Sequence, residues 1–182
     1  MILAILYTLF IIAEICFAFF AAVYALSALY SSFMGSAYVP TKQKEVEYIL
    51  KEAGLKKGQV FYDLGCGDGR VVRTAVKQYK VKGTGIDISP VLIFIANIKC
   101  LLYKVKGVRF RVENIVHTDI HDADVIFIFL MPAFIEKLAP LFKKKLKKKT
   151  LVISHGFKIV QWDKNLVKTI HHIPFPTYFY RL

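Results

Sequence analysis

The first thirty residues form one almost unbroken apolar stretch, whereas the rest of the chain alternates short apolar runs with polar segments. Residues 2–30 are apolar or small, apart from Glu14 and a few hydroxyl-bearing residues. One helical span of a bilayer needs about 20 such residues. The pattern predicts a transmembrane helix in residues 1–34, a linker and short helix in residues 35–58, and a globular domain in residues 59–182. A cleaved signal peptide fits less well, because it would begin with basic residues and have a shorter apolar core.

From residue 59 onward, segments with strand and helix patterns alternate. Helices are expected at about 69–79, 90–104 and 133–149, and strands at about 60–63, 83–87, 108–112, 124–130, 150–155, 167–172 and 177–181. Such alternation is typical of an α/β domain built on a parallel sheet. The predicted fold is therefore a Rossmann-like, doubly wound, seven-stranded sheet preceded by one transmembrane helix.

Three helical segments allow further expectations. The segment 90–104 is apolar nearly all round, which predicts burial under a neighbouring helix, with membrane contact as the alternative. A helix from Thr41 to Ala53 is expected to be capped by Thr41 and ended by Gly54. Glu14 interrupts the membrane helix, where it either faces a partner or is tolerated as a protonated carboxyl.

Charge divides the chain in the same place as hydropathy. The formal net charge is +13, yet no Lys or Arg precedes Lys42. The positive-inside rule then places the N-terminus outside the cell membrane and the globular domain on its cytoplasmic side. Six lysines lie within Lys143–Lys149, where they complement a helix dipole and either contact anionic lipid or are simply solvated. Nucleic-acid binding is not favoured, because no aromatic residues interleave with this run.

The strongest candidate chemistry lies in a glycine turn after the first predicted strand, with the order Asp63-x-Gly65-x-Gly67-x-Gly69. Alternating glycines let a backbone bend sharply and approach a ligand. Asp63 and Asp68 make the turn a poor phosphate cradle, and they favour a ligand with a cationic end. The second predicted strand ends in Asp87, a position where a carboxylate can bind both hydroxyls of a ribose.

This combination differs from the dinucleotide pattern and resembles motif I of the class I S-adenosylmethionine-dependent methyltransferases. The resemblance implies S-adenosyl-L-methionine as cofactor. It also implies that the cofactor is bound by Asp63, Gly65, Cys66, Gly67, Asp68, Gly69, Asp87 and Ile88. In that fold the region after the third strand passes the adenine edge. Asn114 and Ile115 are the candidates there, with Glu113 and Asp119 as alternatives.

Substrate contacts are expected where the fourth predicted strand ends, because open α/β sheets bind ligands at the carboxyl ends of their strands. The candidates are Phe129, Leu130, Met131 and Pro132, together with His155 after the next strand. Methyltransferases that act on bases or glutamine amides carry an Asn/Asp-Pro-Pro-aromatic signature at this place. Leu130-Met131-Pro132 lacks it. No metal is expected, because the three cysteines at 16, 66 and 100 and the histidines show no zinc spacing.

A narrower resemblance rests on the membrane segment, Tyr38-Val39-Pro40-Thr41, Asp124-Val-Ile-Phe-Ile-Phe-Leu-Met-Pro132 and Ser154-His-Gly-Phe157 with Trp162. These features are similar to membrane-anchored protein-lysine methyltransferases of the adenine nucleotide translocase and of the ATP synthase c-subunit. The resemblance implies that Tyr38 and Thr41 cover the cofactor and that the substrate is a lysine of a membrane protein. Methylation of a lipid or small molecule, and a non-catalytic membrane scaffold, are the alternatives.

Overall fold

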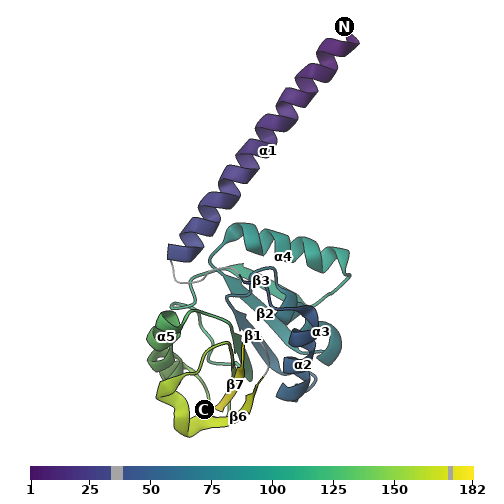
Figure 1. Ribbon diagram of the computed structural model, residues 1–182. Coiled ribbons are helices and arrows are strands. Elements are labelled where there is room, and N and C mark those ends of the chain that lie inside the picture. Colours follow the sequence, from purple (N-terminus) through teal and green to yellow (C-terminus); the bar gives the residue numbers. More distant parts are fainter. Residues whose placement is uncertain (34–38, 172–173) are drawn as a thin grey trace.

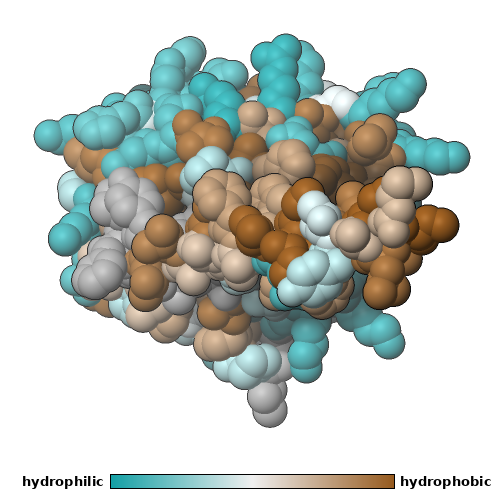
Figure 2. Space-filling view, turned by 90° about the horizontal axis from the view of Figure 1, so that it is seen from above, coloured by the Kyte–Doolittle hydropathy of each residue, from teal (hydrophilic) through white to brown (hydrophobic). Residues whose placement is uncertain are grey.

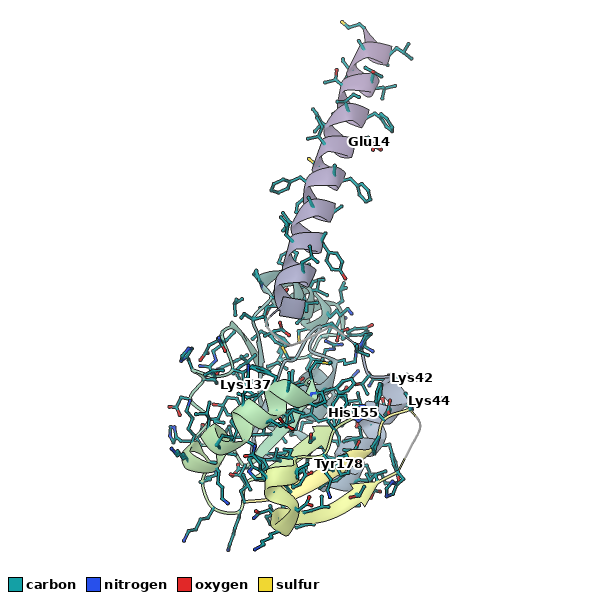
Figure 3. All side chains as sticks on the ribbon, turned by 60° about the vertical axis from the view of Figure 1, so that its left-hand side comes forward. Glu14, Lys42, Lys44, Lys137, His155 and Tyr178 are labelled. Atoms are coloured by element: carbon teal, nitrogen blue, oxygen red, sulfur yellow. The ribbon has the colours of Figure 1, made fainter. Side chains whose placement is uncertain are left out.

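The computed structural model describes residues 1–33, 39–171 and 174–182. A long helix, α1 (Ile2–Phe33), projects away from a globular part that contains all the other elements (Figure 1). Its segment Ile2–Leu26 is long and apolar enough to cross a membrane, with a mean hydropathy of 2.5 and no part of it buried. Glu14 lies in the half of α1 that is remote from the globular part (Figure 3). The sequence correctly predicted one apolar N-terminal helix.

The globular part is a seven-stranded sheet with the strand order β3-β2-β1-β4-β5-β7-β6. The strands are β1 (Val60–Leu64), β2 (Lys82–Asp87), β3 (Val108–Val112), β4 (Val125–Ile128), β5 (Leu151–His155), β6 (Leu166–Ile170) and β7 (Thr177–Arg181). The pairs from β3 to β5 are parallel, whereas β7 runs antiparallel to both β5 and β6. The predicted doubly wound fold with a closing hairpin is confirmed.

Two apolar cores form on the two faces of this sheet because buried side chains alternate along its strands. The helices α2 (Gln43–Ala53) and α3 (Arg70–Tyr79) cover one face through residues such as Ile49 and Val72. The helix α5 (Pro132–Lys145) and the short helix η1 (Val160–Asn165) cover the other through Leu138 and Trp162. The strands β1, β4 and β5 are thereby almost completely buried.

The helix α4 (Pro90–Leu102) contradicts its predicted burial. It begins as expected, with the Ser89 side chain accepting a hydrogen bond from the N–H of Leu92 and Pro90 at the first position. Only its inner side, with Leu92, Ile93 and Ala96, is buried. The outer side carries large apolar residues in the open, including Phe94 at 64% and Leu101 at 79% exposure. The prediction was wrong because α4 packs on β2 and on the edge strand β3, and its contact with α1 leaves these outer residues exposed.

The helix α2 also begins differently from the expectation. It starts at Gln43, with Lys42 at the N-cap position and no side-chain cap, while Gly54 ends it in a left-handed conformation as predicted. Thr41 is instead buried, and its carbonyl oxygen accepts a hydrogen bond from Arg70 at 2.6 Å. The segment that follows α1 is therefore fixed to the start of α3.

The lysine run lies at the opposite end of the sheet from this segment. The Lys147 ammonium pairs with Asp124, which immediately precedes β4, at 2.6 Å. The Lys145 ammonium donates to the carbonyl oxygens of Val116 and Thr118, both at 3.1 Å. These contacts, and the distance along the strands from the linker, favour the solvated alternative over contact with lipid.

Candidate active site

The glycine turn joins β1 to α3 with three residues in the left-handed region. The φ angles are +82° for Gly65, +53° for Gly67 and +72° for Gly69. A side chain is strained in this region, so a turn this tight requires glycine. Glycine therefore recurs at every second position because the backbone is left-handed at these three positions.

The N–H groups of Gly65, Cys66, Gly67 and Gly69 are already used within the chain. Gly65 and Cys66 both donate to the carbonyl oxygen of Ile86, at 2.8 and 2.9 Å, and Gly69 donates to that of Cys66 at 2.8 Å. Gly67 donates to the Asp87 carboxylate at 2.9 Å. A phosphate site needs such groups to point at the ligand. The turn is therefore not a phosphate cradle, in agreement with the sequence.

An aromatic ring from β3 packs tightly onto this turn. A Cβ atom added at Gly69 would lie 2.5 Å from the Phe110 ring, and one added at Gly85 would lie 2.7 Å from it. The same atom at Gly85 would lie 3.0 Å from the Cys66 sulfur. Phe110 thereby sets the position of the turn, a role that the sequence analysis missed.

Two carboxyl groups meet at the carboxyl ends of β1 and β2, and both are buried. Burial first, and then the nearby Asp87 and Asp68, raise the pKa of Asp63 to about 8, although the hydrogen bond from the Val72 N–H opposes them. Burial also raises the pKa of Asp87, against hydrogen bonds from the N–H groups of Ser89 and Gly67. Asp63 is consequently protonated at neutral pH in this structure.

A third carboxyl group, Asp68, has the opposite character. Its burial would raise its pKa, but hydrogen bonds and charges from Arg70 and Lys99 outweigh this and lower the pKa to about 2. Arg70 and Lys99 contact one carboxylate oxygen at 2.9 and 2.6 Å. Arg70 also holds the Thr41 carbonyl, so this ion pair connects the turn to the segment after α1.

A cleft with about 520 Å³ of empty space, including the part open to solvent, lies over these groups. Its lining consists of the turn and its neighbours Asp63, Gly65, Cys66, Gly67, Asp68, Arg70 and Val71, with Asp87, Leu92, Phe127 and Phe129, and with Val39, Pro40 and Thr41 of the linker. Most of these residues lie at or just beyond the carboxyl ends of β1, β2 and β4, where ligands bind in this fold class.

The cleft fits the cofactor expected from the sequence. Each Asp87 oxygen accepts one N–H, from Gly67 and from Ser89, and keeps a further lone pair for a hydroxyl group. The apolar side is formed by Leu92, Phe127 and Phe129. Hydroxyl acceptors and apolar walls suit a nucleoside better than a phosphate.

Asn114, Ile115 and Ile88 are outside the lining of this cleft and have other local contacts. The Asn114 side chain accepts a hydrogen bond from the N–H of Val116 at 3.0 Å and so shapes its own loop. Ile115 is 7% exposed and belongs to the apolar core, while Ile88 is half-buried beside Asp87. Tyr38 lies outside the described residues. A role of these four residues in cofactor binding stays a prediction.

Of the substrate candidates, Phe129 lines the cleft, whereas the next three residues turn away from it. Leu130 is 2% exposed in the core, Met131 is 49% exposed, and Pro132 is the first residue of α5. In the described part of the chain, the lining includes none of these three.

His155 lies inside the domain and is fully buried (Figure 3). Its ring centroid is 4.6 Å from that of Phe129. One ring nitrogen lies 2.9 Å from the Thr177 hydroxyl, and the other lies 3.8 Å from the Glu45 carboxylate of α2. His155 therefore contacts the cleft wall instead of the cleft, and it can act on the site through Phe129.

Sequence reasoning missed Leu92, Phe127, Arg70 and Lys99 as parts of the site or its support. Leu92 and Phe127 belong to apolar runs, and nothing in such a run distinguishes a cleft-lining position from a core position. Lys99 is 31 residues from Asp68, a separation that no local pattern reveals. Arg70 follows the turn directly, and its place in the motif is the one signal that was available.

Comparisons with known proteins give consistent matches. The family model described as the ANTKMT methyltransferase domain matches residues 63–165. A second model, of mycolic acid cyclopropane synthetase, matches residues 19–96, which is less than half of the chain. A protein-lysine N-methyltransferase of Saccharolobus islandicus is 38% identical over 72% of this chain and 83% of its own length. The lysine N-methyltransferase of the ATP synthase c-subunit from Homo sapiens is 24% identical over 71% of this chain, which spans 55% of that relative.

A solved structure shares the fold. An RNA methyltransferase from Salinibacter ruber, in complex with S-adenosyl-L-homocysteine, has a TM-score of 0.75 and 32% identity. The match covers 79% of this chain and 93% of that one. The bound demethylated cofactor agrees with the chemistry of the cleft described above.

Proposed function

This chain belongs to the ANTKMT methyltransferase-domain family and is an S-adenosylmethionine-dependent protein-lysine N-methyltransferase, and on that premise we propose that it methylates lysines of a membrane protein. The family and the cofactor that the motifs predicted are thereby confirmed. The substrate protein lies in the same membrane as α1, with the lysine on the cytoplasmic side.

The observation that carries this proposal is the place of the cleft relative to α1. Val39, Pro40 and Thr41 of the linker line the cleft itself. The helix α1 ends at Phe33, and the six residue steps from there to Val39 reach at most about 20 Å. If α1 spans a bilayer, the cleft opens within that distance of the end of α1 that faces the globular domain.

The relatives support the same substrate class. The human relative is named for the c-subunit of ATP synthase, which is a membrane protein. The orientation rests on the charge pattern, because the first basic residue of the chain, Lys42, follows α1. The globular domain would accordingly face the cytoplasm, where the cofactor is made available.

The side chains of the cleft have separate tasks in such a reaction. Bound S-adenosylmethionine supplies an electrophilic methyl group. Asp87 would hold the ribose hydroxyls, and the turn from Gly65 to Gly69 gives the backbone room to approach the ligand. The aromatic walls Phe127 and Phe129 exclude water at the end of β4. Alignment of two reactants in a dry site is a large part of the rate gain that a transfer reaction needs.

A lysine substrate must also lose its proton before it attacks. From a pKa near 10.4, the neutral amine costs about 4.6 kcal/mol at pH 7. An apolar wall lowers that cost because burial disfavours the ammonium form. Phe129, with His155 packed behind it at 4.6 Å between centroids, is the part of the cleft that can provide this environment.

Two other substrates have one specific observation each in their favour. The solved relative that is 32% identical is named an RNA methyltransferase, which favours RNA. A lipid is the alternative that the partial match to a mycolic acid cyclopropane synthetase supports. Both alternatives would use the same cofactor cleft, so only the product distinguishes them.

The test is an incubation of membranes, ribosomes and soluble extract with the full-length chain and methyl-labelled S-adenosylmethionine. Protein, lipid and RNA are then separated and counted. The proposal expects label in the membrane-protein fraction, and a parallel reaction with Asp87→Ala should give little. Label confined to RNA or to lipid would overturn the membrane-protein assignment.

A further inference from the structure

The outer side of α4 is an apolar stripe on the surface of the domain. Phe94, Ile98, Leu101 and Leu102 follow each other at helical spacing, and they are 64%, 40%, 79% and 70% exposed. Tyr103, at 59% exposure, directly follows the helix. We call these five residues the α4 stripe. Large apolar patches of this kind mark interaction sites in soluble domains.

The α4 stripe lies on the side of the domain from which α1 rises. The helix α4 contacts α1 and runs across its direction, over the top of the globular part (Figure 1). Figure 2 looks down on this side, with α1 nearest the viewer, and shows apolar residues across the middle of the molecule and hydrophilic side chains mostly along its upper edge. A helix that runs across a membrane span, beside the end of that span, lies parallel to the membrane surface.

We propose that the α4 stripe docks on the lipid bilayer that α1 crosses, in the manner of an interfacial helix. Helices of this class bury their apolar side about 5–10 Å into the boundary between headgroups and acyl chains. The sequence of the stripe and of the residues after it fits this depth, because the stripe ends in Tyr103 and the exposed Lys104 and Lys106 follow. Tyrosine and lysine favour the interface and its anionic headgroups.

Docking would give the cleft a fixed orientation toward the membrane. Leu92 on the inner side of α4 lines the cleft, and Phe94 two residues later is on the outer side. The same helix is thus a wall of the site and a membrane contact. With α1 as the first attachment and α4 as the second, the domain cannot rotate freely about its short linker. This inference concerns the membrane contact and holds for any methyl acceptor.

The test uses the depth of a single added tryptophan in the full-length chain. Leu101→Trp is reconstituted in phosphatidylcholine–phosphatidylglycerol vesicles, with or without bromine atoms on the acyl chains, which quench indole fluorescence on contact. Phe94→Trp is the second variant. The matched control is Val167→Trp, which is 58% exposed on β6 at the far end of the domain. The native Trp162, 1% exposed, provides the baseline in every protein.

Brominated lipid is expected to reduce the fluorescence of Leu101→Trp and Phe94→Trp, and to leave that of the parent and Val167→Trp unchanged. Equal quenching in all four proteins would overturn the proposal. An unquenched but water-shielded indole in Leu101→Trp would also overturn it, because a second copy of the chain or another protein would then cover the α4 stripe.

Discussion

Replacement of Asp63 by Asn is expected to remove a destabilisation that grows with pH. Burial raises the pKa of Asp63 from 3.8 to about 8 in the folded chain. The folded chain therefore keeps this proton up to about pH 8, whereas the unfolded chain releases it near pH 4. The stability that the bound proton contributes is complete below the unfolded pKa, and it is lost as the pH rises toward the folded pKa.

The size of the effect follows from linkage. One proton held by the folded state alone changes the free energy of unfolding by about 1.36 kcal/mol per pH unit. Between pH 5 and pH 7 the wild type should thus lose about 2.7 kcal/mol through Asp63. Asn mimics the protonated carboxyl, and its oxygen can still accept the N–H of Val72, a 3.3 Å contact in the wild type.

Urea unfolding in detergent micelles measures the free energy of unfolding at each pH. Trp162 is the reporter, because it is the single tryptophan and is 1% exposed. The difference in unfolding free energy between Asp63→Asn and the wild type should move by about 2.7 kcal/mol in favour of the variant from pH 5 to pH 7. Glu136→Gln, an exposed change on α5, controls for the removal of a charge. If Asp63→Asn and the wild type follow parallel curves, Asp63 is ionised and the reasoning about the site is refuted.

Three further changes test the support of the cleft. In Asp87→Asn an amide nitrogen faces a backbone N–H, so one charge-assisted hydrogen bond, about 1.5–3 kcal/mol, is lost. Calorimetry should therefore show S-adenosylmethionine binding that is roughly 10- to 150-fold weaker. Gly85→Ala should cost about 1–3 kcal/mol in thermal unfolding by overpacking against Phe110, and Phe110→Val in the same chain should recover part of it. Asp68→Asn should be less stable than the wild type at neutral pH, and this gap should close as the pH falls from about 4 toward 2, because the pKa of Asp68 is about 2.

Local chemistry made the glycine turn and its carboxylates predictable. Three glycines in left-handed conformations and an aspartate at the end of β2 leave a signature within about 25 residues, so the cofactor class was accessible from sequence. The alternation of strand and helix patterns predicted the sheet, and the long apolar stretch without basic residues before Lys42 predicted the N-terminal helix.

Contacts between segments that are distant in the chain could not be predicted from the sequence. Phe110 reads as an ordinary strand residue, and its packing against Gly69 depends on the pairing of β2 with β3. The Asp68–Lys99 pair crosses 31 residues. The apolar pattern of α4 was recognised, but hydropathy alone does not tell whether another helix or a bilayer covers a side chain. Burial was the wrong choice because α4 sits at the edge of the sheet.

The central claim is that a lysine of a membrane protein receives the methyl group. The most direct measurement is acid hydrolysis of the labelled membrane proteins after incubation with the full-length chain, followed by separation of the amino acids. The account predicts label in methylated lysine, with little after incubation with Asp87→Ala. Label in any other product, or methyl-lysine only in soluble proteins, would contradict it.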